Sequence, residues 1–327
     1  MPLPLAHETW FVDRIPPSDW GFATHTATLG LLTLAVAVTA LVRLAAHARS
    51  GFDVPVLARL APWMPFALRI HLAVSLVGLL SAGWYLAPGL ELEGLTGWLL
   101  GPVAAVVAVM LLIGWRVREA AALLVVAGPL GMLVYGPGPI LQRADVLGLA
   151  LFLAAAGAGR WSADHELGRE RGASERDLAR ALWMLRIAVG TALIAVAFAE
   201  KLANPALAQA FLDSQSVDFN LAAAVGLPVD DLTFIRVAGA IEVLFGLLVL
   251  SGALPQLVVL VVGLPFNVTL YFFGTVELLG HLPIFAAMLV LLVYGSDPRL
   301  RRWTPALWPW PTSLPVLRRE LAALARR

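Results

Sequence analysis

The chain contains no cysteine among its 327 residues. It therefore has no disulfides, no thiolate nucleophile, no cysteine-bound zinc or iron–sulfur cluster and no CxxCH haem attachment. Any redox role must use a bound cofactor or a quinone. Lysine is almost as scarce, because Lys201 is the only one and every other cation is an arginine. Charge as a whole is rare: 14% of the residues are Asp, Glu, Lys or Arg, against about 25% in a soluble domain.

Apolar residues dominate what is present. Hydrophobic residues make up 60% of the chain, and the mean hydropathy is +0.82. This composition predicts an all-α, polytopic membrane protein. The net charge of +1 gives no indication of a nucleic-acid partner. The N-terminal stretch is polar, charged and proline-bearing, so we expect no cleavable signal peptide there.

Nine segments have the roughly 20 mostly apolar residues that a membrane-spanning helix needs. They cover residues 22–46, 66–87, 95–114, 118–136, 140–158, 183–203, 232–251, 254–273 and 277–295. With the N-terminus outside, all but four of the 23 cations fall on the inner side; the four exceptions are Arg14, Arg143, Lys201 and Arg236. The excess of arginine in cytoplasmic loops thus predicts an outside N-terminus and a cytoplasmic C-terminus in a bacterial inner membrane.

The chain contains an internal repeat. The stretch that starts at Leu68 aligns without gaps to the one that starts at Leu185, and the helix that ends at Gly114 matches the one that ends at Gly252. We therefore expect five parts: an outer N-terminal segment with the first helix (1–65), a degenerate four-helix unit (66–160), a hydrophilic cytoplasmic linker (161–182), a second four-helix unit (183–296) and a basic amphipathic tail (297–327).

Polar groups are concentrated in the second unit. Opposite Glu200 and Lys201, for example, the first unit has Gly83 and Trp84. Ionisable side chains in membrane helices are costly and usually mark function, so we expect the first unit to be mainly structural. The polar residues of the second unit are Glu200, Lys201, Arg236, Glu242, Asn267, Glu277 and His281.

Spacing and depth indicate that these residues form one site in the outer half of the second unit. Glu277 and His281 are four apart, so they share a helix face. Lys201 is expected to pair with Glu242, near the midplane, and Arg236 with a partner on another helix. A location at the headgroups remains open for Glu200, Lys201 and Arg236, and a packing role for His281.

The sequence also contains candidate ligands for a metal ion or a haem. The carboxylates Glu242 and Glu277 with His281 are a weak metal set, and no metal site is predicted. Four histidines near helix ends are the haem candidates, but nothing in the sequence pairs them in space, so haem is not predicted. They are His25, His47, His71 and His281.

Short motifs of the second unit resemble the DoxX-like membrane proteins. The motifs are LRI at Leu185, Gly190, EKLxxP from Glu200 to Pro205, Glu242 before GLLxLxG, and HLP at His281. They cover residues 183–296 well, and 66–160 only through the repeat. The resemblance implies a four-helix membrane unit and a link to the quinone pool, as in the membrane subunit of thiosulfate:quinone oxidoreductase.

These observations lead to two functional hypotheses. In the first, the chain is a membrane subunit of a quinone-linked oxidoreductase: Lys201 and His281 bind the quinone carbonyls, Glu242 and Glu277 relay protons, and an outer-face partner protein supplies electrons. Glu200, Arg236 and Asn267 complete the expected binding surface. In the second, the charged groups are a salt-bridge network in a non-catalytic scaffold, or in a small-molecule or anion carrier. Membrane lipid is the expected surrounding, and self-association is left open.

Overall fold

The structure is a computed structural model that describes residues 8–12, 15–48, 55–215, 219–295, 297 and 300. All regular elements among these residues are helices, and seven of the helices are long and apolar enough to cross a membrane. The prediction of an all-α polytopic membrane protein is therefore confirmed. Apart from residues 297 and 300, the expected amphipathic tail lies outside the described residues.

The long helices follow the predicted apolar segments. They are α2 (Thr26–Ala48), α4 (Met64–Ser81), α5 (Gly94–Ile113), α6 (Val117–Tyr135), α10 (Glu175–Val196), α13 (Asp231–Ser251) and α14 (Pro255–Tyr294). The shorter α-helices are α1 (Trp20–Thr24), α3 (Pro55–Ala58), α7 (Pro137–Leu141), α8 (Ala144–Ala156), α9 (Ala163–Glu166), α11 (Pro205–Ser214) and α12 (Leu221–Ala224). Two 3-10 turns, η1 (Glu8–Trp10) and η2 (Ala61–Trp63), and one π-helical turn, η3 (Ala197–Leu202), complete the set.

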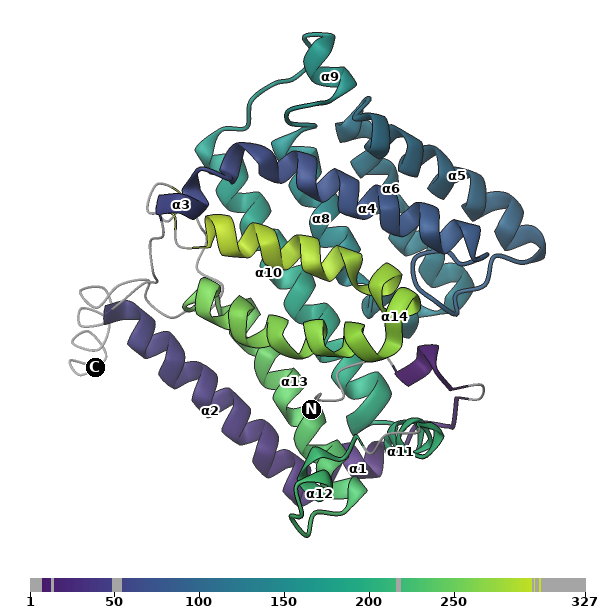
Figure 1. Cartoon of the computed structure of the whole chain (residues 1–327), viewed down its shortest axis with the longest axis vertical. Helices are drawn as coiled ribbons and strands as arrows, with labels where there is room; N and C mark the ends of the chain where they lie inside the picture. The colour runs from purple at the N-terminus through teal and green to yellow at the C-terminus, as the bar shows by residue number, and fades with distance from the viewer. Residues whose placement is uncertain are drawn as a thin grey trace, which may run out of the picture.

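Three of the predicted spans differ from expectation. The fifth is the 13-residue α8, which is short for a membrane span. The eighth and ninth are joined in α14, which breaks at Gly274 (φ 63°, ψ −133°), a conformation that glycine adopts readily. Its two arms fold back on each other, since Phe266 of the first arm packs on His281 of the second and Pro255 lies beside Gly295 (Figure 1).

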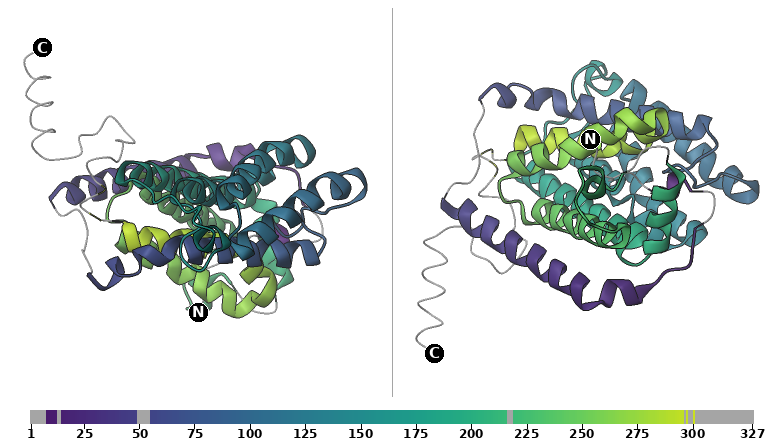
Figure 2. Two further views of the ribbon diagram at one scale, coloured as in Figure 1. Left: turned by 90° about the horizontal axis from the view of Figure 1, so that it is seen from above. Right: turned by 60° about the horizontal axis from the view of Figure 1, so that its bottom comes forward.

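Helix α2 lies along the outside of the bundle, against α13 (Figures 1 and 2). Near the start of both helices, Arg236 Nε donates to Thr28 Oγ1 at 3.0 Å. Near their ends, Arg43 Nη1 donates to the carbonyl oxygen of Ser251 at 2.7 Å. The two helices therefore run in the same direction, each holding the other through one arginine.

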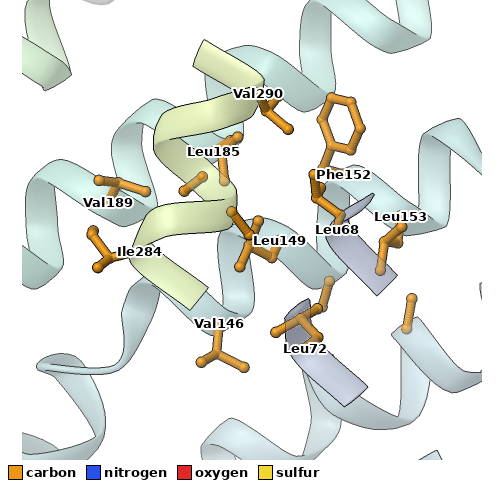
Figure 3. Packing of buried hydrophobic residues seen from close by; sticks show 14 of the residues in the cluster. Leu68, Leu72, Val146, Leu149, Phe152, Leu153, Leu185, Val189, Ile284 and Val290 are labelled. Carbon is orange, nitrogen blue, oxygen red and sulfur yellow. The ribbon is translucent and has the colours of Figure 1, made fainter. Parts of the chain in front are cut away.

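The buried core lies where the two predicted units meet. Helices α4 and α8 and, from the second half of the chain, α10 and the second arm of α14 supply many of its side chains, among them Leu68, Leu149, Leu185 and Val290 (Figure 3). The hydroxyl of Ser75 donates to a backbone carbonyl of α14 at 2.7 Å. The two units thus share one core.

Each unit also begins with an arginine that lies beside the glycine at the end of its second helix. Arg69 donates to the carbonyls of Leu111 (2.9 Å) and Leu112 (2.8 Å), at the end of α5, next to Gly114. Arg186 lies beside Gly252, at the end of α13. Both glycines are left-handed (φ 72° and 63°), as helix C-caps often are.

Helices α10 and α13 approach most closely at Gly190 and Gly246. A Cβ at Gly190 would lie 2.6 Å from the carbonyl oxygen of Gly246, and one at Gly246 would lie 2.8 Å from that of Gly190. We therefore expect Gly190→Ala or Gly246→Ala to destabilise the protein by about 1–3 kcal/mol through overpacking, measured as a lower Tm in detergent.

The matched control is Gly128→Ala, also inside a helix but with no atom within 4 Å of the added Cβ. It should leave Tm unchanged or raise it slightly, because alanine favours helix more than glycine does. Equal loss of Tm in all three variants would contradict the close packing of α10 on α13.

Candidate functional site

The π-helical turn η3 positions two consecutive charged residues in the protein interior. Helix α10 changes into η3 at Ala197, and the amide of Ala203 donates to the carbonyl of Phe198, an i→i+5 bond of 2.8 Å. The wide turn brings both Glu200 and Lys201 inward, with exposed fractions of 0% and 1%. Such turns inside helices are frequent at functional sites. Asn204 then caps α11 and ends the span.

Lys201 forms two ion pairs inside the bundle. Its Nζ lies 2.9 Å from Oε1 of Glu242, about three turns into α13, and 2.6 Å from Oε1 of Glu8 in η1. The expected pair with Glu242 is therefore present. The alternative that Lys201 reaches the headgroups is wrong, because its side chain is 2% exposed.

Glu200 binds the N-terminal segment through both of its carboxylate oxygens. Oε2 accepts the backbone N–H of Glu8 at 2.7 Å, and Oε1 accepts the hydroxyl of Thr9 at 2.8 Å. We call Glu8, Glu200, Lys201 and Glu242 the Lys201 cluster. It joins η1, η3 and α13, and all four residues are at most 5% exposed.

The His281–Glu277 pair lies at the other end of the same N-terminal turn. His281 Nδ1 is 3.1 Å from Oε1 of Glu277, as the i,i+4 spacing predicted, and both side chains are buried. The indole of Trp10 lies against the imidazole, with 5.0 Å between ring centroids, while Phe266 meets it edge-on at 4.9 Å. Gly280 permits this approach, since a Cβ there would collide with the Trp10 ring.

The charges of the Lys201 cluster do not balance by themselves. Three carboxyl groups surround one ammonium group, and excess buried charge is costly. The cluster is neutral only when two carboxyl groups hold protons. Burial raises the pKa of Glu8 well above its ordinary value; Lys201 opposes this shift and Glu200 adds to it. Burial thus favours the protonated form of Glu8.

Two of the expected site residues lie elsewhere. The contacts that the structure gives Arg236 are with the N-terminal helices: its guanidinium lies 4.3 Å from the centre of the Phe22 ring and donates to Thr28. Asn267 is exposed and donates to the carbonyl of Gly263 on its own helix at 2.7 Å. The structure therefore does not bring Arg236 and Asn267 to the Lys201 cluster, contrary to expectation.

Glu8, Thr9 and Trp10 were missed because sequence reasoning treated residues before the first helix as an outer segment. Glu8 and its partner Glu200 are 192 positions apart, and no periodicity connects them. The available signal was an acid followed by two aromatic residues, Trp10 and Phe11, in an otherwise polar terminus.

Comparisons with protein-family models, with curated proteins and with solved structures gave no match to this chain. Membership of the DoxX-like family therefore stays a prediction from the motif residues.

Lys201→Met removes the cation of the cluster and leaves Glu8 and Glu242 without their partner. Breaking a buried ion pair from one side typically costs about 3–5 kcal/mol, so we expect a large drop in Tm. Lys201→Met combined with Glu242→Leu should recover part of that loss, because an apolar pair leaves less uncompensated charge. A double variant no more stable than the single one would contradict the pairing.

Docking of the N-terminal segment should weaken as pH rises. The ionisable groups that face it are Lys201 and Glu200 of η3, Glu242 of α13, and Glu277 and His281 of α14. Undocked Glu8 ionises near its ordinary pKa of about 4.3, whereas docked Glu8 keeps its proton to higher pH. The stabilisation from this proton is complete below about pH 4.3 and is lost as pH rises through the docked pKa.

The measurement uses Thr9→Cys as the only thiol in the chain. Its labelling rate in detergent should rise with pH more steeply with Glu8 present than in a Glu8→Gln background. The ratio of the two rates cancels ionisation of the thiol itself. A ratio that stays constant with pH would show that Glu8 does not control docking.

Proposed function

We propose that the chain is the membrane subunit of a quinone-linked oxidoreductase, and that it binds a quinone in the place where the N-terminal segment docks. The observation that carries this proposal is the position of Trp10. Its flat aromatic ring fills the space between His281 and Gly280, which is the shape that a quinone ring requires. The motif resemblance in residues 183–296 points to the same class of ligand.

The groups around this space have the chemistry that quinone reduction needs. A quinone takes up two electrons and two protons to become a quinol. His281 and Lys201 supply hydrogen-bond donors for the two oxygens, and a protonated carboxyl group is a proton source beside them. Electrons come from a partner protein, since the described residues include no thiolate or other evident redox centre.

The arginine distribution supports an orientation with the Lys201 cluster on the outer side of a bacterial inner membrane. The cluster lies at the bundle end where α10 ends, α13 begins and α14 folds back. The redox partner then docks on that outer face, next to the N-terminal segment.

A second candidate function is a scaffold held together by the Lys201 cluster. One observation favours it: the docked segment covers the ammonium group and the imidazole, with Glu8 2.6 Å from Lys201 Nζ and the Trp10 ring 5.0 Å from the His281 ring. In a scaffold, the N-terminal segment stays docked, and no ligand competes with residues 8–10 for their place beside Lys201 and His281.

A menaquinone analogue separates the two candidates. We expect it to raise the Tm of the wild type, to bind roughly tenfold more tightly to Trp10→Ala, in which the ring space is free, and to lose its effect in His281→Gln. Trp98→Ala is the matched control, because Trp98 is 82% exposed on the first unit. Equal, negligible binding to all four proteins would remove the quinone proposal in favour of the scaffold.

A further inference from the structure

A charged cavity of about 570 Å³ lies at the end of the bundle opposite the Lys201 cluster. It is formed by the start of α6, by Ala158 just past the end of α8 and by the segment around α9, which is at the top of Figure 1. Its volume is within the ~300–1,000 Å³ of typical ligand sites. Its charged lining residues are Arg116, Arg118, Arg169 and Arg171, with Glu119, Asp164 and Glu170.

Two of the three acids are used by the protein backbone. Asp164 accepts the N–H groups of Arg116 and Val117, both at 2.9 Å, at the start of α6. Glu170 accepts those of Ala158 (3.2 Å) and Gly159 (3.4 Å), just past the end of α8. These carboxylates therefore build the wall of the cavity.

One of the four arginines also binds the protein backbone. Arg118 donates to the carbonyls of Ala155 at 3.0 Å and Arg171 at 2.8 Å, and so ties the α9 segment to the end of α8. For the guanidinium groups of Arg116, Arg169 and Arg171, the described residues supply no hydrogen bond or ion pair. Three of the four arginines that line the cavity can thus contact a ligand, and, within the described part of the chain, Glu119 is the one acid there that does not bind the backbone.

Aromatic residues place the cavity at the level of the lipid headgroups. Trp115, next to Arg116, is 43% exposed, and its ring lies 5.6 Å from the Arg116 guanidinium. Trp161 is 68% exposed and packs edge-on against Trp63 at 5.0 Å. Exposed tryptophans are enriched at membrane–water interfaces.

We propose that this cavity binds the phosphate headgroup of an anionic phospholipid. Arg116, Arg169 and Arg171 contact the phosphate, while Arg118, Asp164 and Glu170 hold the wall. Guanidinium groups match phosphate oxygens in geometry as well as charge, and basic pockets beside membrane helices bind such headgroups. The site is separate from the Lys201 cluster, so it does not depend on the proposed quinone function.

The test is native mass spectrometry of the full chain in non-ionic detergent, titrated with phosphatidylglycerol or phosphatidylcholine. We expect selective binding of phosphatidylglycerol and a roughly tenfold or greater loss of affinity in Arg169→Gln/Arg171→Gln. Arg176→Gln/Arg180→Gln removes the same charge from exposed positions of α10 that do not line the cavity. This control should retain affinity within about twofold.

Three further measurements complete the test. Arg169→Lys/Arg171→Lys keeps the charge but not the guanidinium geometry, and should lose less affinity than the glutamine double variant. The Tm of each variant without lipid shows whether it is folded. Inorganic phosphate at millimolar concentration should not displace the lipid. Two results would overturn the assignment to a phospholipid headgroup. One is an equal loss of lipid affinity in the two glutamine double variants, and the other is full displacement of the lipid by inorganic phosphate.

Discussion

The structure depends on how one ammonium group is accommodated inside a membrane bundle. An isolated buried lysine would cost several kcal/mol, so its neighbours must supply opposite charge. Glu242 of α13 does so at 2.9 Å from Lys201 Nζ, and the carboxyl group of Glu8 in the N-terminal turn lies 2.6 Å from the same atom. The cluster therefore sets the position of α10 relative to α13, and it also holds a segment 192 positions away against η3. Packing alone would not specify that last contact.

The two predicted units share one core but differ at the position of the buried lysine. Where the second unit has Lys201, the first has Trp84, and the neighbouring Tyr85 donates to the carbonyl of Ala127 at 3.0 Å. The first unit keeps a separate buried pair, with Arg143 Nη2 3.7 Å from Asp145 Oδ2 at the start of α8. Only the second unit combines several carboxyl groups with a lysine and a histidine, which is why the proposed chemistry belongs there.

Hydropathy was sufficient to predict every long helix, because a span needs little more than length and apolarity. It could not predict that α14 is one hairpin, since that depends on the backbone of Gly274. Within the site, helical spacing predicted the Glu277–His281 pair. The need to neutralise a buried charge predicted the Lys201–Glu242 pair. Contacts that depend on tertiary placement were beyond such rules: Glu8 was missed, and Arg236 was assigned to the site although it faces α2.

The N-terminal turn links the two halves of the candidate site, and this determines what any ligand must do. Glu8 contacts Lys201 and Trp10 covers His281, so a molecule that uses both donors has to displace residues 8–10 together. Displacement exposes Glu8 to solvent and returns its pKa towards the ordinary value of about 4.3, so a proton that Glu8 holds when docked is released at neutral pH. Docking of residues 8–10 and protonation of Glu8 therefore favour each other. The pH range in which the segment stays docked also limits the pH range in which a ligand can reach both donors.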